Sequence, residues 1–197
     1  MEMERTIRKL DDLTEDDLER LDQLSERLRP AAADLLIDML KRLEPGTPEN
    51  AELGMISVYE HSLQCATRAY QAGEDDEMVV VALLHDVADW LSPYNHDDVG
   101  AELLRPYVSD GNYWLLKHHA IFQLFHARRG TDQDRNVRER YVDHPAYDKT
   151  VCFCAKYDQV SFDPDYETMP LSVFEPIVRR VVTAERAQTF ESQRFDG

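Results

Sequence analysis

An apolar run that ends in a histidine and an aspartate constrains this chain of 197 residues more than any other feature. Val79–Leu84 are apolar without the alternation of a half-buried strand, which indicates a segment buried on every side. His85 and Asp86 follow directly, and no lysine or arginine neighbours the carboxylate in the sequence. A carboxylate at the end of a buried segment is costly without a partner. One metal ion can bind both the imidazole and the carboxylate, so it is the partner that explains both residues. When the two residues are taken alone, a solvated helix end explains them equally well.

The remaining segments have helical patterns and no alternating strand patterns, so the predicted fold class is all-α. Besides the apolar run, helices are expected over residues 14–29, 31–43, 55–72, 97–104, 112–126, 146–161 and 171–187. Thr14 followed by Asp17 is typical of a helix N-cap, Pro30 is expected to separate the first two helices, and Gly73 to stop the third. The charged residues 128–140 are expected to be solvated surface.

The turn Glu44–Pro48 is the expected boundary between two parts of the chain. Residues 1–46 would form an N-terminal helical appendage, a helical pair, and residues 47–197 the main domain with the C-terminal helices. A pair of this kind serves packing or dimerisation, so a homodimer is compatible with the sequence. No chemistry is assigned to it.

The formal net charge of −17 argues against nucleic-acid and anionic-membrane partners, which bind basic surfaces. No apolar run approaches the roughly 20 residues needed to span a bilayer, and the first residues carry no apolar signal region. Three cysteines within apolar stretches favour reduced thiols over disulfides. We therefore expect a soluble, cytoplasmic protein.

Several helices carry a polar residue on an inner face or at an end. His61 shares a stripe with Cys65 and other small residues, so it points inward, as a metal ligand or as a core histidine. Gln64, about one turn on, is placed to support such a ligand. His96 opens a later helix, and Asp158 lies on the buried stripe of another.

The segment 112–126 carries two adjacent histidines, His118 and His119, beside Lys117. Neighbouring residues on a helix diverge by about 100°, so the two imidazoles cannot address one point. Together with His61, His85, Asp86, His96 and Asp158, one of them completes a set of six donors. One metal rarely uses six protein ligands with no open position, whereas two metals that share Asp86 would account for the set.

At these residues the chain resembles the HD-domain superfamily, and within it the mixed-valent di-iron oxygenases that cleave phosphonates, with myo-inositol oxygenase a distant relative. The resemblance covers about residues 51–159 and is closest over Tyr59–Ala66 and Glu77–Asp86; it continues through His96–Gly100 and Tyr157–Asp158. It implies an HD-domain helical bundle with two metal ions, Fe(II)/Fe(III), and a small-molecule substrate.

The resemblance also implies a ligand set: His61, His85 and Asp158 for one metal, His96 and His119 for the other, with Asp86 bridging. His119 is preferred to His118 because the family motif has a residue four positions on that matches Gln123. The expected substrate contacts are Gln123, Lys117 and Gln64, and no catalytic residue is assigned beyond the metal ligands.

The substrate-binding residues depart from those of the phosphonate-cleaving enzymes. Their tyrosine and glutamate before the first ligand match Ala51 and Gly54, their lysine matches Gln123, and their arginine before the last aspartate matches Ala155. These residues offer neither a carboxylate for an amine nor a cation for a phosphonate. Small amino-hydroxyphosphonates are therefore expected to be poor substrates.

Three functions remain open from the sequence. The first is a di-iron oxygenase that uses O₂ to cleave a small hydroxylated substrate, organophosphonates included. The second is a metal-dependent HD phosphohydrolase, in which the metals activate water for attack on a phosphomonoester or nucleotide. Such an enzyme needs cations near the phosphate, for which Lys117 is the nearby candidate, and Asp89 stands where a basic residue is common in relatives. The third is a protein that binds metal or ligand without turnover.

Overall fold

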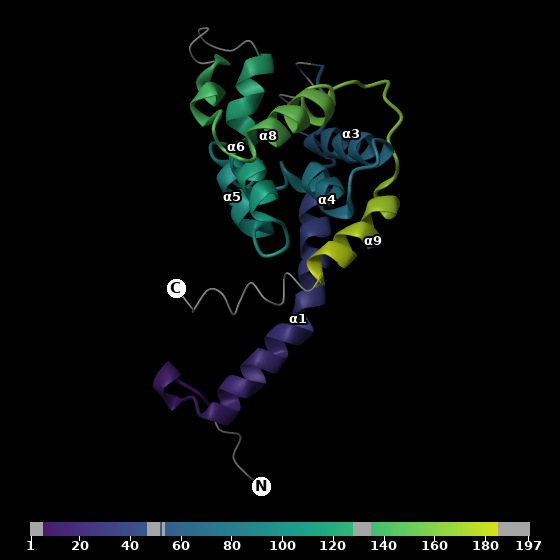
Figure 1. Ribbon diagram of the computed structural model, residues 1–197. Coiled ribbons are helices and arrows are strands. Elements are labelled where there is room, and N and C mark those ends of the chain that lie inside the picture. The colour runs from purple at the N-terminus through teal and green to yellow at the C-terminus, as the bar shows by residue number, and fades with distance from the viewer. Residues whose placement is uncertain (1–5, 47–51, 53, 128–134, 185–197) are drawn as a thin grey trace.

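The computed structural model describes residues 6–46, 52, 54–127 and 135–184 (Figure 1). These residues form helices and turns and contain no strand, so the all-α prediction is confirmed. The α-helices are α1 (Glu15–Lys41), α3 (Val58–Gln71), α4 (Asp76–Leu84), α5 (His96–Leu104), α6 (Asp110–Ala127), α8 (Tyr147–Phe153) and α9 (Leu171–Val182). Short helical segments are η1 (Leu10–Asp12), η2 (Val137–Tyr141) and η3 (Cys154–Asp158), the last of which is a π-helix.

The expected N-terminal helical pair is a single helix, α1, and the predicted break at Pro30 was wrong. Thr14 caps it through a reciprocal pair of bonds with Asp17, as expected. A proline inside a helix costs about 3 kcal/mol. Each buried leucine or isoleucine side chain contributes about 1.5–3 kcal/mol, and three of them beyond Pro30 in this helix join the core: Leu36, Ile37 and Leu40. That burial outweighs the cost of Pro30 and keeps the helix continuous.

The two halves of α1 therefore differ in environment. The first half extends away from the other helices and exposes Leu18, Leu21, Leu24 and Leu28 (Figure 1). The second half packs against α9 within the core. The domain boundary after residue 46 and the homodimer remain predictions.

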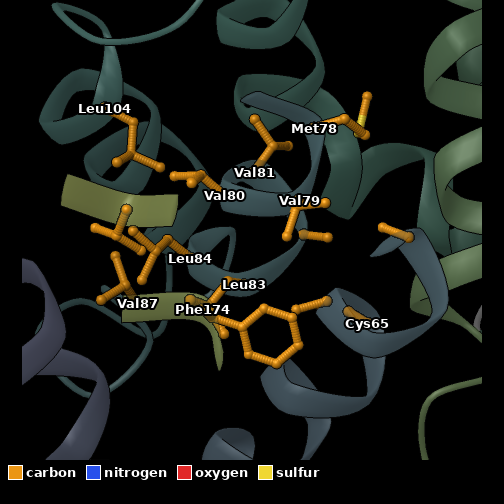
Figure 2. Packing of buried hydrophobic residues seen from close by; sticks show 14 of the residues in the cluster. Cys65, Met78, Val79, Val80, Val81, Leu83, Leu84, Val87, Leu104 and Phe174 are labelled. Atoms are coloured by element: carbon orange, nitrogen blue, oxygen red, sulfur yellow. The ribbon is translucent and has the colours of Figure 1, made fainter. Parts of the chain in front are cut away.

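Helix α4 lies at the centre of the core, as its apolar run predicts. All seven residues Met78–Leu84 are buried, and the helix packs against α3, α6 and α9 (Figure 2). At its N-terminal end, Glu77 accepts hydrogen bonds from the backbone of Ser109 and the side chain of Asn112, which ties α4 to the start of α6. Because neighbouring helices surround α4, its position is fixed relative to them. The residues that follow its C-terminal end are therefore held in a defined position.

The helices around α4 have clear start and stop signals. Ser57 and Glu60 form a capping box at the start of α3. At its end, Gly73 has φ of 78°, and the N–H groups of Gly73 and Glu74 donate to the carbonyls of Tyr70 and Ala69. This is a Schellman motif, and it confirms the predicted stop at Gly73.

Three expectations from the C-terminal half need correction or comment. The helix predicted over residues 146–161 is α8 followed by the π-helical η3. Of the charged run 128–140, residues 128–134 lie outside the described part, but Arg138 is 9% exposed and not solvated surface as predicted. Helix α9 ends at Val182; the predicted end at residue 187 lies outside the described residues. Among the described helices, none is long and apolar enough to span a membrane.

Candidate metal centre

The histidine–aspartate pair lies where α4 ends. His85 is the C-cap of the helix, and Asp86 begins the series of turns that follows. The C-terminal end of a helix carries partial negative charge, which favours a cation there. Gly100 of α5 lies against this turn: a Cβ added to it would be 3.1 Å from the carbonyl oxygen of His85. The close approach of α5 brings His96, one turn earlier on that helix, toward Asp86.

One group of donors gathers around Oδ2 of Asp86. Nε2 of His85 lies 3.3 Å and Nε2 of His61 3.6 Å from this oxygen. The two Nε2 atoms are 3.1 Å apart, and Oδ1 of Asp158 is 3.5 Å from His61 and 3.9 Å from His85. His61, His85 and Asp158 are 2%, 0% and 0% exposed, so they form a buried three-residue group beside one carboxylate oxygen.

A second group gathers around Oδ1 of Asp86. Nε2 of His119 lies 3.1 Å and Nε2 of His96 3.3 Å from this oxygen. The two oxygens of one carboxylate therefore face two different sets of imidazoles. The structure brings together all six residues that the sequence predicted as ligands.

Backbone contacts orient three of the four imidazoles. Nδ1 of His61, His85 and His119 lies within 2.6–3.0 Å of the carbonyl oxygens of Ser161, Ala82 and Leu116 respectively. A carbonyl can only accept, so in each ring Nδ1 carries the proton and donates it. A ring that holds its proton on Nδ1 presents an Nε2 lone pair to the cluster when it is neutral, as a metal-ligating histidine does.

The charges of the cluster are strongly coupled. Burial alone would raise the pKa of Asp86, but the neighbouring imidazoles, His85 first, hold it well below its usual value. Burial opposes protonation of His96, yet the hydrogen bond and charge of Asp86 outweigh burial and raise the pKa of His96 to about 9. The pKa of His119 is raised in the same way, with Asp86 outweighing burial. Burial would also raise the pKa of Asp158, but the hydrogen bond to His61 and the charge of His85 lower it, so both carboxylates are held ionised.

Asp158 reaches the cluster through a local departure from α-helical geometry. The N–H of Gln159 donates to the carbonyl of Cys154, five residues earlier, which defines a π-helical turn. Tyr157 and Asp158 are both buried in this turn. Short π segments are frequent at functional sites.

The donor set fits a metal ion. Two Nε2 lone pairs at 3.1 Å repel each other unless a proton or a cation lies between them. Oδ2 of Asp158 is buried and has no hydrogen-bond partner, although buried polar atoms are almost always paired. Imidazole nitrogen and carboxylate oxygen suit zinc, iron and manganese, so the donors do not select one metal.

Cys65 lies at the edge of this cluster and was not expected there. Its Sγ belongs to a group with His61, His85 and Asp158 whose ligand atoms all lie within 4.8 Å of one another. Burial raises the pKa of Cys65, and its thiol donates to the carbonyl oxygen of Tyr157. Because only a thiolate is a good metal ligand, we leave Cys65 out of the ligand set.

The three expected substrate contacts have different surroundings. The amide of Gln123 donates to Oδ1 of Asp158 at 2.7 Å, which places it against the cluster. Gln64 is buried, and its side-chain amide donates to the carbonyl of Asp163 and accepts from the N–H of the same residue. Lys117 forms ion pairs with Asp98 and Glu102 on the surface. Roles in substrate binding remain predictions for all three.

His118 points away from the cluster. Its Nδ1 donates to the carbonyl of Trp114, and its ring stacks on the Trp114 ring with centroids 4.1 Å apart. His119 alone of the two faces Asp86.

The sequence analysis did not assign several other residues near the cluster to the site. The ring of Phe162 stacks on His61 at 4.3 Å, and Oδ1 of Asp89 lies 3.7 Å from Nδ1 of His96. His126 and Arg138 each bury an unpaired nitrogen. Asp89 was noted in the sequence for its position three residues after Asp86, and His126 continues at helical spacing the face that carries His119.

Comparison with known proteins agrees with this geometry. Residues 58–152 match the family model of the HD domain. The chain is also similar to [1-hydroxy-2-(trimethylamino)ethyl]phosphonate dioxygenase (glycine-betaine-forming) of Leisingera caerulea, at 35% identity over 81 residues. That alignment covers 36% of this chain and 41% of the relative, so the chain matches less than half the length of this curated protein. The family match and the all-helical fold together identify residues 58–152 as an HD domain.

Proposed function

We propose that this protein is a dinuclear-metal HD-domain oxygenase, with an Fe(II)/Fe(III) pair, that cleaves a small hydroxylated organophosphonate. The proposal rests mainly on the positions of the two carboxylate oxygens of Asp86. Oδ2 faces His61 and His85, and Oδ1 faces His96 and His119. A carboxylate bridge between two metals needs this arrangement. The similarity to a phosphonate dioxygenase supports the reaction class, though over only part of each chain.

Each metal would have its own protein ligands. His61, His85 and Asp158 would hold one, and His96 and His119 the other, with Asp86 shared. The iron pair would supply the binding of O₂ and of the substrate hydroxyl, and the one-electron steps of the oxidation. For an α-hydroxyphosphonate the balanced reaction is RCH(OH)PO₃²⁻ + O₂ → RCOO⁻ + HPO₄²⁻ + H⁺, which needs no second oxidant.

The protein's own side chains would fix the geometry. The backbone carbonyls that accept from Nδ1 hold three imidazoles in the orientation that a metal requires. Gln123 donates to Asp158 and keeps that carboxylate from rotating. Phe162 covers the His61 ring and limits the approach of water on that side.

The same ligands would also serve a phosphohydrolase with two redox-inert metals. Sequence reasoning placed Lys117 as the nearby cation for a phosphate, and that side chain is engaged by Asp98 and Glu102. The buried Arg138 is a cation of the kind that a hydrolase needs, so this alternative is kept.

Metal analysis of anaerobically purified protein tests the proposal. We expect about two iron equivalents per chain and an EPR signal from a mixed-valent pair after partial oxidation. Asp86→Asn should lower occupancy at both positions together, because both metals share its charge. The control is Asp98→Asn, which removes one carboxylate charge at an exposed position outside the cluster. Loss of one metal equivalent only would mean that Asp86 is a terminal ligand.

Activity assays separate the two chemistries. O₂ uptake coupled to phosphate release from 1-hydroxyalkylphosphonates supports the oxygenase, and phosphate release from phosphomonoesters without O₂ uptake supports the hydrolase. The expected poor use of (2-amino-1-hydroxyethyl)phosphonate is tested in the same assay. Rapid coupled turnover of that compound would contradict it.

A further inference from the structure

Arg138, in η2, is a buried cation that lies on an aromatic ring. The residue is 9% exposed, and its Nε is buried and has no hydrogen-bond partner. Among the described residues its one ion pair is with the exposed Glu139, at 3.6 Å from Nε, which is longer than a hydrogen bond. The guanidinium carbon lies 3.5 Å above the centre of the Phe125 ring. That contact holds the side chain in place without neutralising its charge.

His126 lies beside this cation and also buries an unpaired atom. Its ring is 5.2 Å from the ring of Phe125, on which Arg138 lies. Nε2 of His126 is buried and has no hydrogen-bond partner. Burial, and after it the charge of Arg138, lower the pKa of His126, so the ring is neutral at pH 7. Two unpaired nitrogen groups thus come together on one aromatic ring.

Helix α6 connects this pair to the metal centre. His119, Gln123 and His126 lie at i, i+4 and i+7, which is one face of the helix. His119 contacts Asp86 and Gln123 contacts Asp158, so this face is directed at the cluster. His126 follows Gln123 by three residues, or about 4.5 Å along the axis. Asp158 also acts electrostatically on His126. His126 therefore lies about one helical turn beyond Gln123 and about two turns beyond the candidate ligand His119.

A buried guanidinium whose carboxylate partner is exposed and beyond hydrogen-bond distance still costs stability. Such a cost is retained where a bound anion offsets it. Guanidinium groups bind phosphate and phosphonate oxygens in two parallel hydrogen bonds, and a neutral histidine with its proton on Nε2 can add a third.

We propose that Arg138 and His126 form a subsite for the doubly charged oxyanion, phosphonate or phosphate, of the substrate. The subsite rests on the proposed function in one respect, namely that the rest of the substrate lies at the metals. It supplies the cation that sequence reasoning found missing at Gln123 and Ala155. In an α-hydroxyphosphonate the hydroxyl and the phosphorus are bonded to the same carbon, so the substrate and the long side chain of Arg138 must together bridge the distance between the metals and the subsite.

Binding of hydroxymethylphosphonate to the Fe(II)-loaded protein under anaerobic conditions tests the subsite, measured by titration calorimetry. Arg138→Met keeps an apolar stem on Phe125 and removes the charge. The matched control is Arg140→Met, the same change at an exposed residue of the same segment. We expect about tenfold or greater loss of affinity for Arg138→Met and less than twofold for Arg140→Met. Equal affinities of the two variants, or no binding by the unmodified protein, would overturn the subsite.

A second pair of variants keeps the test decisive if Arg138→Met does not fold. His126→Phe removes Nε2 and should weaken binding about three- to tenfold, whereas His118→Phe, on the same helix but stacked on Trp114, should not. If neither pair differs, the subsite does not exist.

Repeating the titrations after chelation separates this proposal from the proposed function. The ratio of affinities between the unmodified protein and Arg138→Met should persist without metal, while both affinities fall. If chelation leaves binding unchanged and Arg138→Met still weakens it, the metals do not hold the substrate and the subsite stands. If chelation abolishes binding and Arg138→Met has no effect, the metals bind the probe and the subsite fails.

Discussion

The side-chain amide of Gln123 donates a hydrogen bond to Oδ1 of Asp158, with 2.7 Å between nitrogen and oxygen. Asp158 is fully buried, and its other oxygen has no hydrogen-bond partner. Gln123 is therefore the side-chain amide that fixes the direction of this carboxylate. Since Asp158 is an expected ligand, the amide controls how well it can meet a metal.

Gln123→Leu should weaken metal binding about 10–100-fold, because loss of a group that orients a ligand has effects of this size. Leucine fills a similar volume, so the fold should be retained. Gln159→Leu is the control, since within the described part of the chain the Gln159 side-chain amide bonds only the carbonyl of Ala155. Competition with a fluorescent chelator measures both affinities. Equal affinities would mean that Asp158 is oriented without Gln123.

Replacing His119 by Ala should remove about one metal equivalent per chain, because its Nε2 is one of two imidazole nitrogens at Oδ1 of Asp86. His118→Ala should leave the metal content unchanged and lower thermal stability instead, through loss of its stacking on Trp114. Metal analysis and thermal melts of both variants provide the measurement. A reversed result would contradict the position of α6 in the structure.

Gly100→Ala should weaken metal binding even though alanine favours a helix. The added Cβ would lie 3.1 Å from the carbonyl of His85, so α5 or the turn at Asp86 must shift by a few tenths of an ångström. His96 moves with α5, and its distance to Asp86 changes.

Gly111→Ala, in α6, is the matched control for Gly100→Ala. A Cβ there meets no atom within 4 Å, so this variant should gain about 0.5–1 kcal/mol of stability and keep its metal affinity. Chemical denaturation and metal titration of the two variants give the comparison. A stability gain in Gly100→Ala with unchanged metal affinity would show that α5 adjusts without disturbing the site.

Features that depend on neighbouring residues in the sequence could be predicted, and features that depend on distant packing could not. The apolar run of α4 and the Gly73 stop are local patterns, and both were predicted correctly. The continuity of α1 past Pro30 was not predictable, because it depends on packing against α9 at the other end of the chain. The six donors were found because histidine and aspartate on inner helix faces are rare enough to notice.

Other site features depend on contacts that no local pattern encodes. The π turn that contains Asp158 has no sequence signature. Arg138 lies in a run of charged residues, and charge runs are usually solvated. Its burial depends on the ring of Phe125, which comes from a different element. The sequence therefore identified the six donors that the structure brings together, but not the residues packed around them.

Metal binding should strengthen as the pH rises from about 6.5 to about 9. In the metal-free protein Asp86 raises the pKa of His96 from 6.5 to about 9, against the effect of burial, so the ring holds a proton over this range. A histidine must lose that proton to bind a metal, so the apparent affinity increases by up to about tenfold per pH unit for each proton released. The raised pKa also stabilises the metal-free fold: this contribution is complete below pH 6.5 and is lost as the pH rises through about 9.

The melting temperature of chelator-treated protein should therefore fall between pH 6.5 and about 9, while the increase in melting temperature that Mn²⁺ causes should grow. Melts at pH 6.5, 7.5 and 8.5 with and without Mn²⁺ measure both effects, and His96→Gln should flatten both trends. A metal-induced shift that is the same at all three pH values would contradict a role for His96 as a ligand.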